Sequence, residues 1–494
     1  MQSAVSRQKQ LITVSAVANA QKQGVAEAEC IEASDTTMFQ ELVQSSECRI
    51  NKGYKMIITQ KTDMICENLR RNSDGELCFA GMPLSPLAEK YGTPLYLYDE
   101  DRVRHNCRSY IEAVREGFGE TARVMYASKA ASFKQLYRIV KEEGLGVDVV
   151  SCGEIYTAAL ADFPLENAYF HSNNKTDADI EFAISRGVGY FVVDNAEELF
   201  AIDEIAAKHG IRQKIMLRIT PGIDPHTYAA VATGKVDSKF GSAIETGQAK
   251  AITSLALTFD NLELCGFHCH VGSQIFDGEV YLATSRVMLR FIADMERELG
   301  FICRDLDIGG GLGVRYIESQ PVINIKETIL TVADEMKREA ARLGITLPRI
   351  SLEPGRSIVA DAGLTLYTVG TVKRIPGYKT YVSVDGGMTD NPRYALYGSP
   401  YTILPVLDGE GERESCSVVG RCCESGDILQ ENVQLRADTE RGDLLACLTT
   451  GAYHYSMASN YNRIPRPPVV MLKNGESYLA VKRESLEDII KLDI

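Results

Sequence analysis

The sequence predicts an α/β plus all-β chain: a (β/α)8 TIM-type barrel with a second, C-terminal β-domain that also takes an N-terminal strand. Three observations lead to this prediction. Short apolar runs alternate with helix-like stretches up to Pro354, the pattern then changes to successive strand-like runs, and one further strand-like run precedes the barrel. A content of 45% hydrophobic and 24% charged residues among 494 is ordinary for a globular chain.

Eight apolar runs are assigned to the barrel because each has the length of a buried parallel strand. They are VMYAS from Val124, GVDVVS from Gly146, AYFHS from Ala168, GYFVVD from Gly189, KIMLRI from Lys214, LCGFHCHV from Leu264, DLDIGG from Asp305 and RISLEPG from Arg349. Helix-like stretches such as KQLYRIVKEEG and EVYLATSRVMLRFIADMERELG separate them. An open doubly wound sheet is the alternative, but eight successive units favour the closed barrel.

Polar residues follow these strands, and in a barrel all the strand ends face one mouth. They are Lys129, Ser151, His171 with Asn173, Asp194, Arg218, His270, the glycines 309 to 311, and Glu353. A lysine after a buried strand is costly unless its ammonium is paired or its nucleophilicity is used. The ordinary alternative for Lys129 is a stem packed on the strand end with the charged head in water.

The second domain is expected from strand-like runs such as LTLYTVGTVKRI and from the hairpin VVMLKNGESYLAVK, with Asn474 and Gly475 at its turn. The strand TPLYLYDE from Thr93 is expected to join this sheet. The predicted domains are an N-terminal extension over residues 1–60, disordered or dispensable, an N-terminal part of the β-domain over 64–100, the barrel over 101–356 and the C-terminal β-domain over 357–494.

Bulk properties exclude several classes of protein. The net charge of -14 and the lack of a basic run argue against nucleic-acid binding. The 13 cysteines have no framework spacing, and neither a signal peptide nor an 18-residue apolar run is found, so a reduced cytoplasmic protein away from membranes is expected. Basic residues before Glu27 resemble a transit peptide and leave organelle targeting as a minor alternative. Met56 and Met64 are alternative starts.

Two motifs near the mouth suggest anion binding. LDIGGGLG at 306–313 places a glycine turn after a strand, where bare backbone N–H groups can reach phosphate oxygens. It lacks the third glycine and immediate helix of a dinucleotide fingerprint, and a plain tight turn is its alternative. In LEPGRS, Glu353 and Arg356 offer a carboxylate and a guanidinium, and a surface ion pair is the alternative.

Two further motifs carry histidines and cysteines. FHCHVGSQ places His268 and His270 on one face of a strand, but a metal would need a third ligand and none is obvious, so no metal is predicted. His270 is better suited to stacking or hydrogen bonding with a cofactor ring. In GRCCESGDIL, Cys422 and Cys423 are adjacent and would point to opposite faces of a strand. Small buried hydrophobes are the alternative for both cysteines.

Taken in order, YASKA, HVGSQ, DIGGGLG, EPGRS, NPRYALYG, CCESGDIL and GAYHYSMASNYN resemble the motifs of the diaminopimelate decarboxylases. These are barrel-type pyridoxal-phosphate enzymes related to ornithine and arginine decarboxylases and to alanine racemases. The resemblance runs from about Met64 to the C-terminus and excludes only the N-terminal extension.

The resemblance implies a pyridoxal 5'-phosphate site in which Lys129 holds the cofactor as a Schiff base. Its other implied cofactor-binding residues are His270 against the ring, Ser273, Gly309, Gly310, Gly311 and Tyr453 at the phosphate, Glu353 at the pyridine nitrogen, and the adjoining Pro354, Gly355 and Arg356. A carboxylate keeps that nitrogen protonated and favours decarboxylation, whereas a racemase is expected to place an arginine there.

The resemblance also implies a reaction, a substrate and an assembly. Cys423 would donate the proton to the α-carbon, and Cys423 and Glu424 would reach into the site of a partner in a homodimer. The substrate would be meso-diaminopimelate, bound by Arg356, Arg393, Tyr397, Glu424 and Tyr453, and the products L-lysine and CO2. An ornithine- or arginine-type decarboxylase and a non-catalytic pyridoxal-phosphate-binding homologue are the alternatives. The first would lack the arginine of NPRYALYG, and the second would be expected to lose Lys129, Cys423 or the β-domain.

Overall fold

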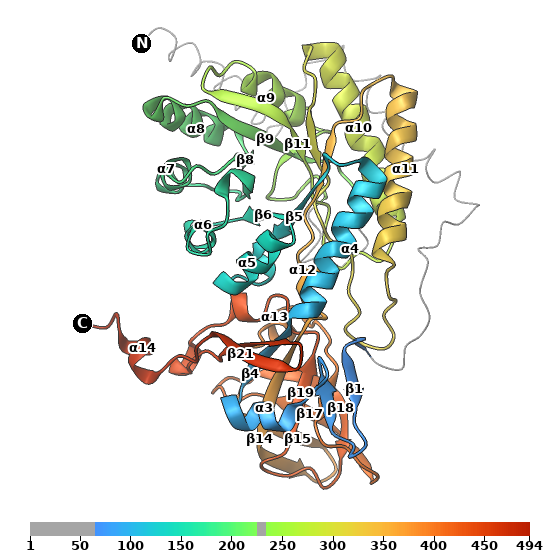
Figure 1. Cartoon of the computed structure of the whole chain (residues 1–494), viewed down its shortest axis with the longest axis vertical. Helices are drawn as coiled ribbons and strands as arrows, with labels where there is room; N and C mark the ends of the chain where they lie inside the picture. Colours follow the sequence, from blue (N-terminus) through green and yellow to red (C-terminus); the bar gives the residue numbers. More distant parts are fainter. Residues whose placement is uncertain (1–64, 225–233) are drawn as a thin grey trace, which may run out of the picture. The chain divides into compact units, whose positions relative to one another are not determined.

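The structure is a computed structural model that describes residues 65–224 and 234–494. These residues belong to one compact unit, which Figure 1 shows as a barrel and a second sheet. The expectations for the extension over residues 1–60, and for starts at Met56 or Met64, lie outside the described residues.

Eight parallel strands close into a barrel, which confirms the fold predicted from the apolar runs. They are β5 (Arg123–Ala127), β6 (Gly146–Val149), β7 (Ala168–Phe170), β8 (Tyr190–Val193), β9 (Gln213–Thr220), β11 (Leu262–His268), β12 (Asp305–Asp307) and β13 (Arg349–Leu352). Each pairs in parallel with the next of this series, and β13 pairs with β5 to close the ring. The short strand β10 (Ser242–Ala243) lies beside β9.

Helices surround the barrel strands in Figure 1. They are α4 (Glu100–Phe118), α5 (Lys134–Glu142), α6 (Cys152–Ala159), α7 (Asp177–Ser185), α8 (Ala196–His209), α9 (Gln248–Ala256), α10 (Glu279–Leu299), α11 (Ile325–Leu343) and the short α12 (Arg356–Val359). Side-chain caps fix some of their starts: Asp99 accepts a hydrogen bond from the Arg102 N–H ahead of α4, and Asn195 from the Glu198 N–H ahead of α8.

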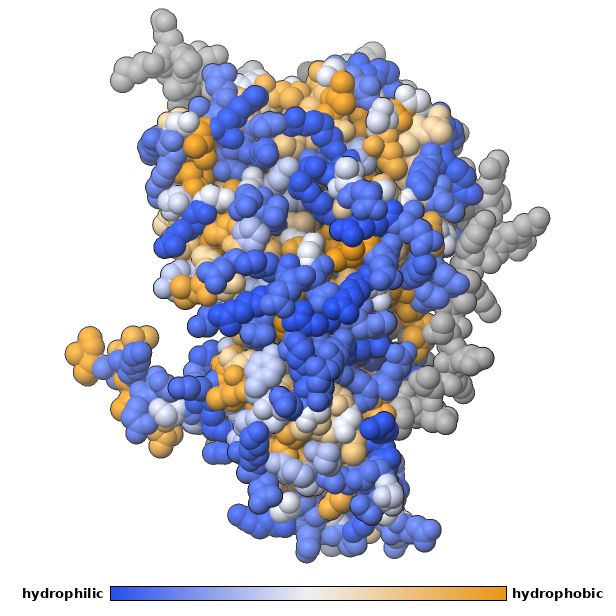
Figure 2. All heavy atoms as spheres, viewed as in Figure 1, coloured by the Kyte–Doolittle hydropathy of each residue, from blue (hydrophilic) through white to orange (hydrophobic). Residues whose placement is uncertain are grey.

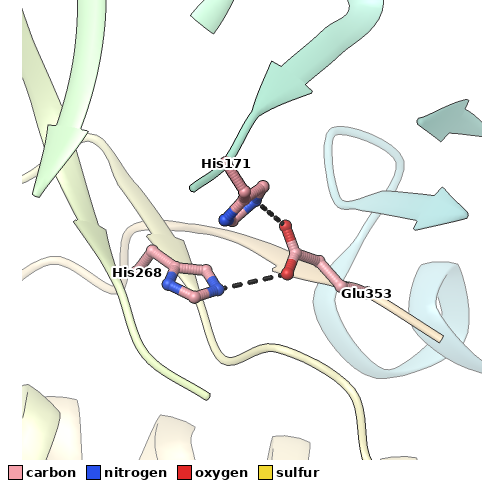
Figure 3. Close-up of side chains that lie close together, drawn as sticks. All are labelled: His171, His268 and Glu353. Atoms are coloured by element: carbon pink, nitrogen blue, oxygen red, sulfur yellow. Dashed lines mark hydrogen bonds and ion pairs between the residues drawn. The ribbon is translucent and has the colours of Figure 1, made fainter. Parts of the chain in front are cut away.

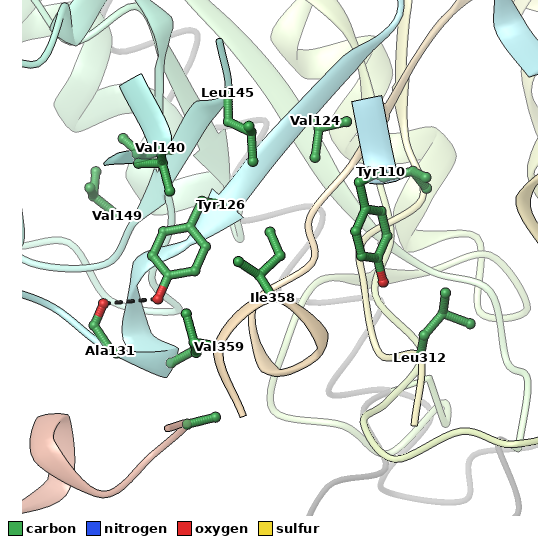
Figure 4. Close-up of a cluster of buried hydrophobic side chains, with 14 of the residues drawn as sticks. Tyr110, Val124, Tyr126, Ala131, Val140, Leu145, Val149, Leu312, Ile358 and Val359 are labelled. Carbon is green, nitrogen blue, oxygen red and sulfur yellow. Dashed lines mark hydrogen bonds between the residues drawn. The ribbon is translucent and has the colours of Figure 1, made fainter. Parts of the chain in front are cut away.

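Strand residues alternate between two apolar clusters, as the pleat of a barrel strand requires. In β8, Phe191 and Val193 belong to the large core that includes the helices, whereas Tyr190 and Val192 join a small separate cluster. That cluster also contains Met125, Tyr169, Met216 and Cys265 from other barrel strands. Figure 4 shows part of the large core, where the Tyr126 hydroxyl donates to the Ala131 carbonyl at 2.9 Å. The barrel is therefore packed inside as well as outside.

The second sheet uses strands from both ends of the described chain. Its strands are β4 (Leu95–Asp99), β14 (Gly363–Ile375), β15 (Lys379–Val384), β16 (Ile403–Pro405), β17 (Arg413–Val419), β18 (Ile428–Arg436), β19 (Leu444–Leu448), β20 (Val469–Lys473) and β21 (Glu476–Val481). Strand β4 lies antiparallel to β14 and parallel to β20, which confirms that a strand preceding the barrel completes this sheet. The β20–β21 turn has positive φ at Asn474 and Gly475, as the sequence of that hairpin indicates.

Smaller elements complete the fold. Strands β1 (Leu69–Arg71), β2 (Leu77–Phe79) and β3 (Met82–Pro83) form a small sheet followed by α3 (Leu84–Tyr91), and α13 (Arg393–Tyr397) and α14 (Leu486–Ile490) are short helices. The face in Figure 2 is mostly hydrophilic, and its apolar side chains include a group toward the C-terminus, where Leu486, Ile490 and Leu492 are exposed. Within residues 65–224 and 234–494, no helix has the length and apolarity needed to cross a bilayer.

Candidate active site at the barrel mouth

Lys129 lies in a single 3-10 turn, Ser128–Ala130, directly after β5. Its Nζ donates to Oδ2 of Asp148 at 2.6 Å, and its side chain is 41% exposed while that of Asp148 is fully buried. Partial desolvation disfavours the ammonium, but the charges of Asp148 and Glu353 outweigh it and raise the pKa of Lys129 above its usual value. The lysine is thus a paired cation facing the mouth, and not a stem with a free head in water.

Asp148 is a site residue that was not predicted from the sequence. It comes from the middle of the buried strand β6, and its Oδ1 makes no hydrogen bond with a described residue but lies 3.9 Å from His171 Nε2. The signal in the sequence is a single aspartate within the apolar run GVDVV, where an unpaired carboxylate would be costly.

Glu353 follows β13 and is held by two histidines from other strands (Figure 3). Its Oε1 lies 2.7 Å from His171 Nε2 and its Oε2 lies 3.1 Å from His268 Nε2. All three side chains are buried. Residues separated by up to 182 positions in the sequence therefore meet here, as the convergence of barrel strand ends predicts.

These contacts set the charge of the cluster. Desolvation opposes ionisation of Glu353, but the two histidines reverse that effect and hold the pKa of Glu353 well below its usual value. Burial lowers the pKa of His268 to about 4 against the opposing pull of Glu353, so the His268 ring is neutral near pH 7. Asp307 is buried nearby, and burial together with the Glu353 charge raises the pKa of Asp307 well above its usual range.

The same three side chains bear on the question of a metal. No third ligand beside His268 and His270 is obvious from the sequence, whereas the structure brings ligand atoms of His171, His268 and Glu353 within 4.8 Å of one another. Each carboxylate oxygen of Glu353 already accepts a hydrogen bond from one of the two histidines. The set is therefore equally suited to fixing a carboxylate anion in one orientation.

The glycine turn 309–311 follows β12 and packs closely against backbone. A Cβ at Gly310 would lie 2.1 Å from the Glu353 carbonyl oxygen, and one at Gly311 would lie 2.1 Å from that of Gly272. The Gly309 N–H donates to Asp307 Oδ1 at 2.7 Å. Glycine is thus required by the close approach of two chain segments, and it leaves the turn without side chains over the mouth. His270 contacts this turn, since its Nδ1 lies 3.4 Å from the Gly310 nitrogen.

Arg356, at the start of α12, is buried beside the turn. Its guanidinium donates to Ser273 Oγ at 3.0 Å and to the Tyr316 hydroxyl at 2.8 Å. It also lies over the ring of Tyr453, 4.7 Å from its centroid. Pro354 and Gly355 are buried between Glu353 and Arg356, and a Cβ at Gly355 would meet the Ala127 side chain at 2.9 Å. Ser273, Arg356 and Tyr453 are therefore brought together.

Arg393, in α13, has a second buried guanidinium group near Tyr453. It lies 5.1 Å from the Tyr453 ring centroid and 5.0 Å from that of the exposed Tyr397. Its Nε is buried without a hydrogen-bond partner among the described residues. A buried guanidinium nitrogen in this state can take an anionic ligand at low cost.

Cys423 and Glu424 lie apart from this buried group, on the loop between β17 and β18. Both are exposed, and the Cys423 backbone N–H donates to Asn462 Oδ1 at 2.8 Å. The sequence placed Cys422 and Cys423 on a strand, which is wrong because β17 ends at Val419. Their different exposures therefore come from a turn and not from strand alternation.

The arrangement can bind and polarise a small anionic molecule. A lysine amine, an ionised carboxylate, two buried guanidinium groups and a glycine turn surround one mouth. The amine can attack a carbonyl carbon, and the guanidinium groups can each bind a phosphate or carboxylate.

Comparisons with known proteins agree with this chemistry. Residues 101–360 match the family model of the pyridoxal-dependent decarboxylases, pyridoxal binding domain. A diaminopimelate decarboxylase of Bacillus subtilis (strain 168) is 43% identical over 426 residues, which cover 86% of this chain and 97% of that protein. That of Staphylococcus aureus (strain COL) is 42% identical over 422 residues, covering 85% and 98%.

Solved structures are similar over the same extent. The diaminopimelate decarboxylase of M. jannaschii in complex with L-lysine is 33% identical, with a TM-score of 0.80 and coverage of 87% of this chain and 98% of that one. The enzyme of Helicobacter pylori with L-lysine is 32% identical, with a TM-score of 0.75 and coverage of 83% and 99%.

Proposed function

The chain belongs to the diaminopimelate decarboxylase family of pyridoxal-dependent decarboxylases, and from this premise we propose how its own residues carry out the reaction. The reaction is the pyridoxal-phosphate-dependent decarboxylation of meso-2,6-diaminopimelate to L-lysine and CO2, the last step of lysine biosynthesis. The chain is accordingly a carboxy-lyase.

The residues at the mouth fit this cofactor. The glycine turn is too crowded for any Cβ, and buried Arg356 with Ser273 lies close to it, which suits a phosphate group. Lys129 would carry the cofactor through its Nζ, Glu353 would face the ring nitrogen, and His270 would face the ring. Gly309, Gly310, Gly311, Ser273 and Tyr453 would hold the phosphate, with Pro354, Gly355 and Arg356 adjoining. When bound, the cofactor supplies an electron-poor ring that accepts the electron pair left by departing CO2.

The role of Glu353 follows from its fixed negative charge. Because His171 and His268 each bind one of its oxygens, the carboxylate cannot rotate freely and stays ionised across the ordinary pH range. A fixed anion facing the ring nitrogen would keep a proton on that nitrogen, and this would strengthen electron withdrawal. An arginine here, as expected of a racemase, would repel that proton. Glu353 therefore supports decarboxylation.

Asp148 positions the Lys129 side chain. The 2.6 Å contact holds the ammonium in place at the mouth, and the charges of Asp148 and Glu353 raise the pKa of Lys129, so the pair favours the cation. Lys129 must therefore give up a proton before its Nζ can act as a nucleophile.

Substrate selection is assigned to the distal end of the ligand, which carries an ammonium and a carboxylate. Arg393, whose buried Nε has no partner among the described residues, would bind the carboxylate together with Arg356, and Tyr397 and Tyr453 would add hydroxyl groups. Glu424 would hold the ammonium. A diamine-forming decarboxylase has no distal carboxylate to bind, so the two buried guanidinium groups favour diaminopimelate over ornithine or arginine.

We assign proton donation at the α-carbon to Cys423 and place Cys423 and Glu424 in the site of a partner subunit, so that the homodimer has shared sites. Support comes from their exposure on the β17–β18 loop, where a second chain can cover them. A cytoplasmic location is proposed as well, supported by the absence of disulfides among the described cysteines.

The test is release of CO2 and formation of L-lysine by the purified protein, with meso-diaminopimelate, L-ornithine and L-arginine compared at equal concentration. The main support is the convergence of Lys129, Glu353 and buried Arg393 at one mouth. Turnover of meso-diaminopimelate alone is expected. Preference for L-ornithine would overturn the assignment of Arg393, and the absence of any turnover in the cofactor-loaded protein would favour a non-catalytic homologue.

A further inference from the structure

Asp427 is a buried carboxylate in the CESGD sequence, and none of the roles assigned above uses it. It is 3% exposed, and both of its oxygens accept backbone hydrogen bonds. Oδ1 accepts the Met388 N–H at 2.6 Å, and Oδ2 accepts the Cys422 N–H at 2.7 Å. One side chain therefore joins two segments that are far apart in the sequence.

Each of these segments leads into residues assigned to the substrate. Met388 belongs to the turn before Arg393, and the Asn391 N–H donates to the Gly387 carbonyl at 2.8 Å to close that turn. Cys422 immediately precedes Cys423. The Asp427 carboxylate accepts hydrogen bonds from both N–H groups. It therefore fixes the spacing between the turn before Arg393, here called the Arg393 loop, and the β17–β18 loop with Cys423, here called the thiol loop or Cys423 loop.

The space around Asp427 is built for a carboxylate of this length. A Cβ at Gly387 would lie 2.6 Å from both Asp427 oxygens, and one at Gly420 would lie 2.3 Å from the nearer of them. Two glycines thus leave room for the carboxylate, and a longer side chain would have to displace backbone. The Gly420 N–H also donates to the Asp427 carbonyl at 2.9 Å, which closes the thiol loop on itself.

Asn462 supplies a second anchor to the thiol loop alone. Its Oδ1 accepts the Cys423 N–H at 2.8 Å. The neighbouring Ser459 N–H donates to the Thr389 carbonyl at 2.8 Å, so the segment that carries Asn462 is itself tied to the turn that Asp427 holds. Asp427 and Asn462 both accept hydrogen bonds from backbone N–H groups of the thiol loop. Neither of these hydrogen bonds involves the exposed Cys423 thiol.

We propose that Asp427 is a positioning residue that locks the Arg393 loop and the Cys423 loop together, and that Asn462 completes the lock on Cys423. The proposal rests on the proposed function, because it assumes that Cys423 is the proton donor and that Arg393 binds substrate. Asp427 touches neither the substrate nor the reacting atoms; it sets the distance between groups that do.

The test compares Asp427→Asn, Asn462→Ala and the control Asp438→Asn in full-length, cofactor-loaded protein. Asp438 is an exposed carboxylate of the same sheet domain that binds Arg436 at 2.7 Å. Asp427→Asn replaces one acceptor by an N–H donor that faces another N–H, so kcat should fall about 10- to 10²-fold and KM for meso-diaminopimelate should rise. Asn462→Ala should lower kcat and leave KM unchanged, and Asp438→Asn should alter neither.

A second readout does not depend on turnover. The rate of iodoacetamide alkylation at Cys423, followed by mass spectrometry of its peptide, should rise several-fold in Asp427→Asn and Asn462→Ala, because a loosened loop withdraws the thiol from the proposed partner site more often. Cofactor content and melting temperature are measured alongside. A purely structural role would lower those two values and leave kcat per loaded molecule intact, which would overturn the proposal.

The outcomes separate this inference from the proposed function. If the wild type forms no lysine, the proposed function fails, and the alkylation rates still decide whether the two residues hold the loop. If Asp427→Asn does not fold, Asn462→Ala, changed at an exposed position, decides alone. If Asn462→Ala has the kcat and the Cys423 alkylation rate of the wild type, the proposal that these residues hold the Cys423 loop is wrong.

Discussion

At the barrel mouth, Glu353 is buried and each of its oxygens is bound by a histidine, whereas Cys423 and Glu424 lie exposed on the β17–β18 loop of the sheet domain. The Glu353 region is formed entirely by one chain, because its charges are paired and its side chains are buried there. In the β17–β18 loop, the backbone N–H of Cys423 is hydrogen-bonded, but the side chains of Cys423 and Glu424 are exposed to solvent. The proposed cofactor site lies in the enclosed region, and in the proposed homodimer a partner subunit would cover the exposed region.

The largest effect is expected when Lys129 is removed from the enclosed region. Lys129→Ala should lower kcat by about 10³-fold or more, since no other described amine replaces Nζ at the end of β5. The protein should also lose the visible absorbance that borohydride bleaches when a cofactor is bound to a lysine. Lys134→Ala, at an exposed position of the next helix, should keep both properties. A bleachable band in Lys129→Ala would remove the assignment.

The next experiment asks whether the two regions come from different chains. Lys129→Ala and Cys423→Ala should each be nearly inactive, and mixing them under mildly dissociating conditions should restore activity. After exchange about half of the dimers are mixed, and one site in each combines an intact lysine with an intact cysteine, so about a quarter of all sites recover. Lysine formation before and after exchange measures this.

Two results would contradict the shared site. No recovery despite confirmed exchange would place both residues in the site of one chain. A fully active Cys423→Ala would remove the proton-donor role as well, and would leave the cysteine with a structural role.

A smaller effect is expected when the charge of the enclosed region is removed and its shape is kept. Glu353→Gln should bind cofactor but lower kcat about 10²-fold, because a neutral amide cannot keep the ring nitrogen protonated. Glu204→Gln, an exposed carboxylate on α8, is the control. Steady-state kinetics measures the loss, and a kcat within twofold of the wild type would show that the carboxylate charge is dispensable.

The smallest effect concerns the support of the turn before Arg393. Asp390 holds the turn before Arg393: its Oδ2 accepts the Tyr367 hydroxyl at 2.5 Å and its Oδ1 accepts the Gly387 N–H at 2.9 Å. Burial raises the pKa of Asp390 to about 7 against those two hydrogen bonds. A carboxyl group whose pKa is higher in the folded than in the unfolded protein stabilises the fold. This contribution is fully present at pH values below the unfolded pKa and is lost as the pH rises toward 7.

Asp390→Asn should therefore weaken the pH dependence of stability. Between pH 5 and pH 7 the wild type should lose about 1 kcal/mol per pH unit from this group, and the variant should not. Melting temperatures at pH 5, 6 and 7 test this, with Asp438→Asn as the control. An unchanged slope in Asp390→Asn would show that Asp390 is ionised throughout this range.

The sequence predicted the barrel because buried parallel strands appear as short apolar runs, and Val124 to Ala127 of β5 is a clear example. Strand β18 was not predicted, since polar residues such as Gln430 and Glu431 interrupt its apolar positions. The residues at the strand ends were identified, but the His171–Glu353 contact was not, because side-chain pairing depends on the register of strands distant in sequence. The approach of His171 and Glu353 to His268 was not predicted for the same reason.

One structural feature bears on how this chain is made. Strand β4 lies between β14 and β20, and Tyr96 of β4 is separated in the sequence from its partners Thr365 and Val469 by the whole barrel. A ribosome therefore releases β4 long before its neighbours exist, so this strand must wait with an unpaired edge during most of translation. Barrel residues can collapse first, because their pairings join neighbours along the chain. Chains truncated before Gly363 should consequently show a protease-resistant barrel and a cleavable segment around β4.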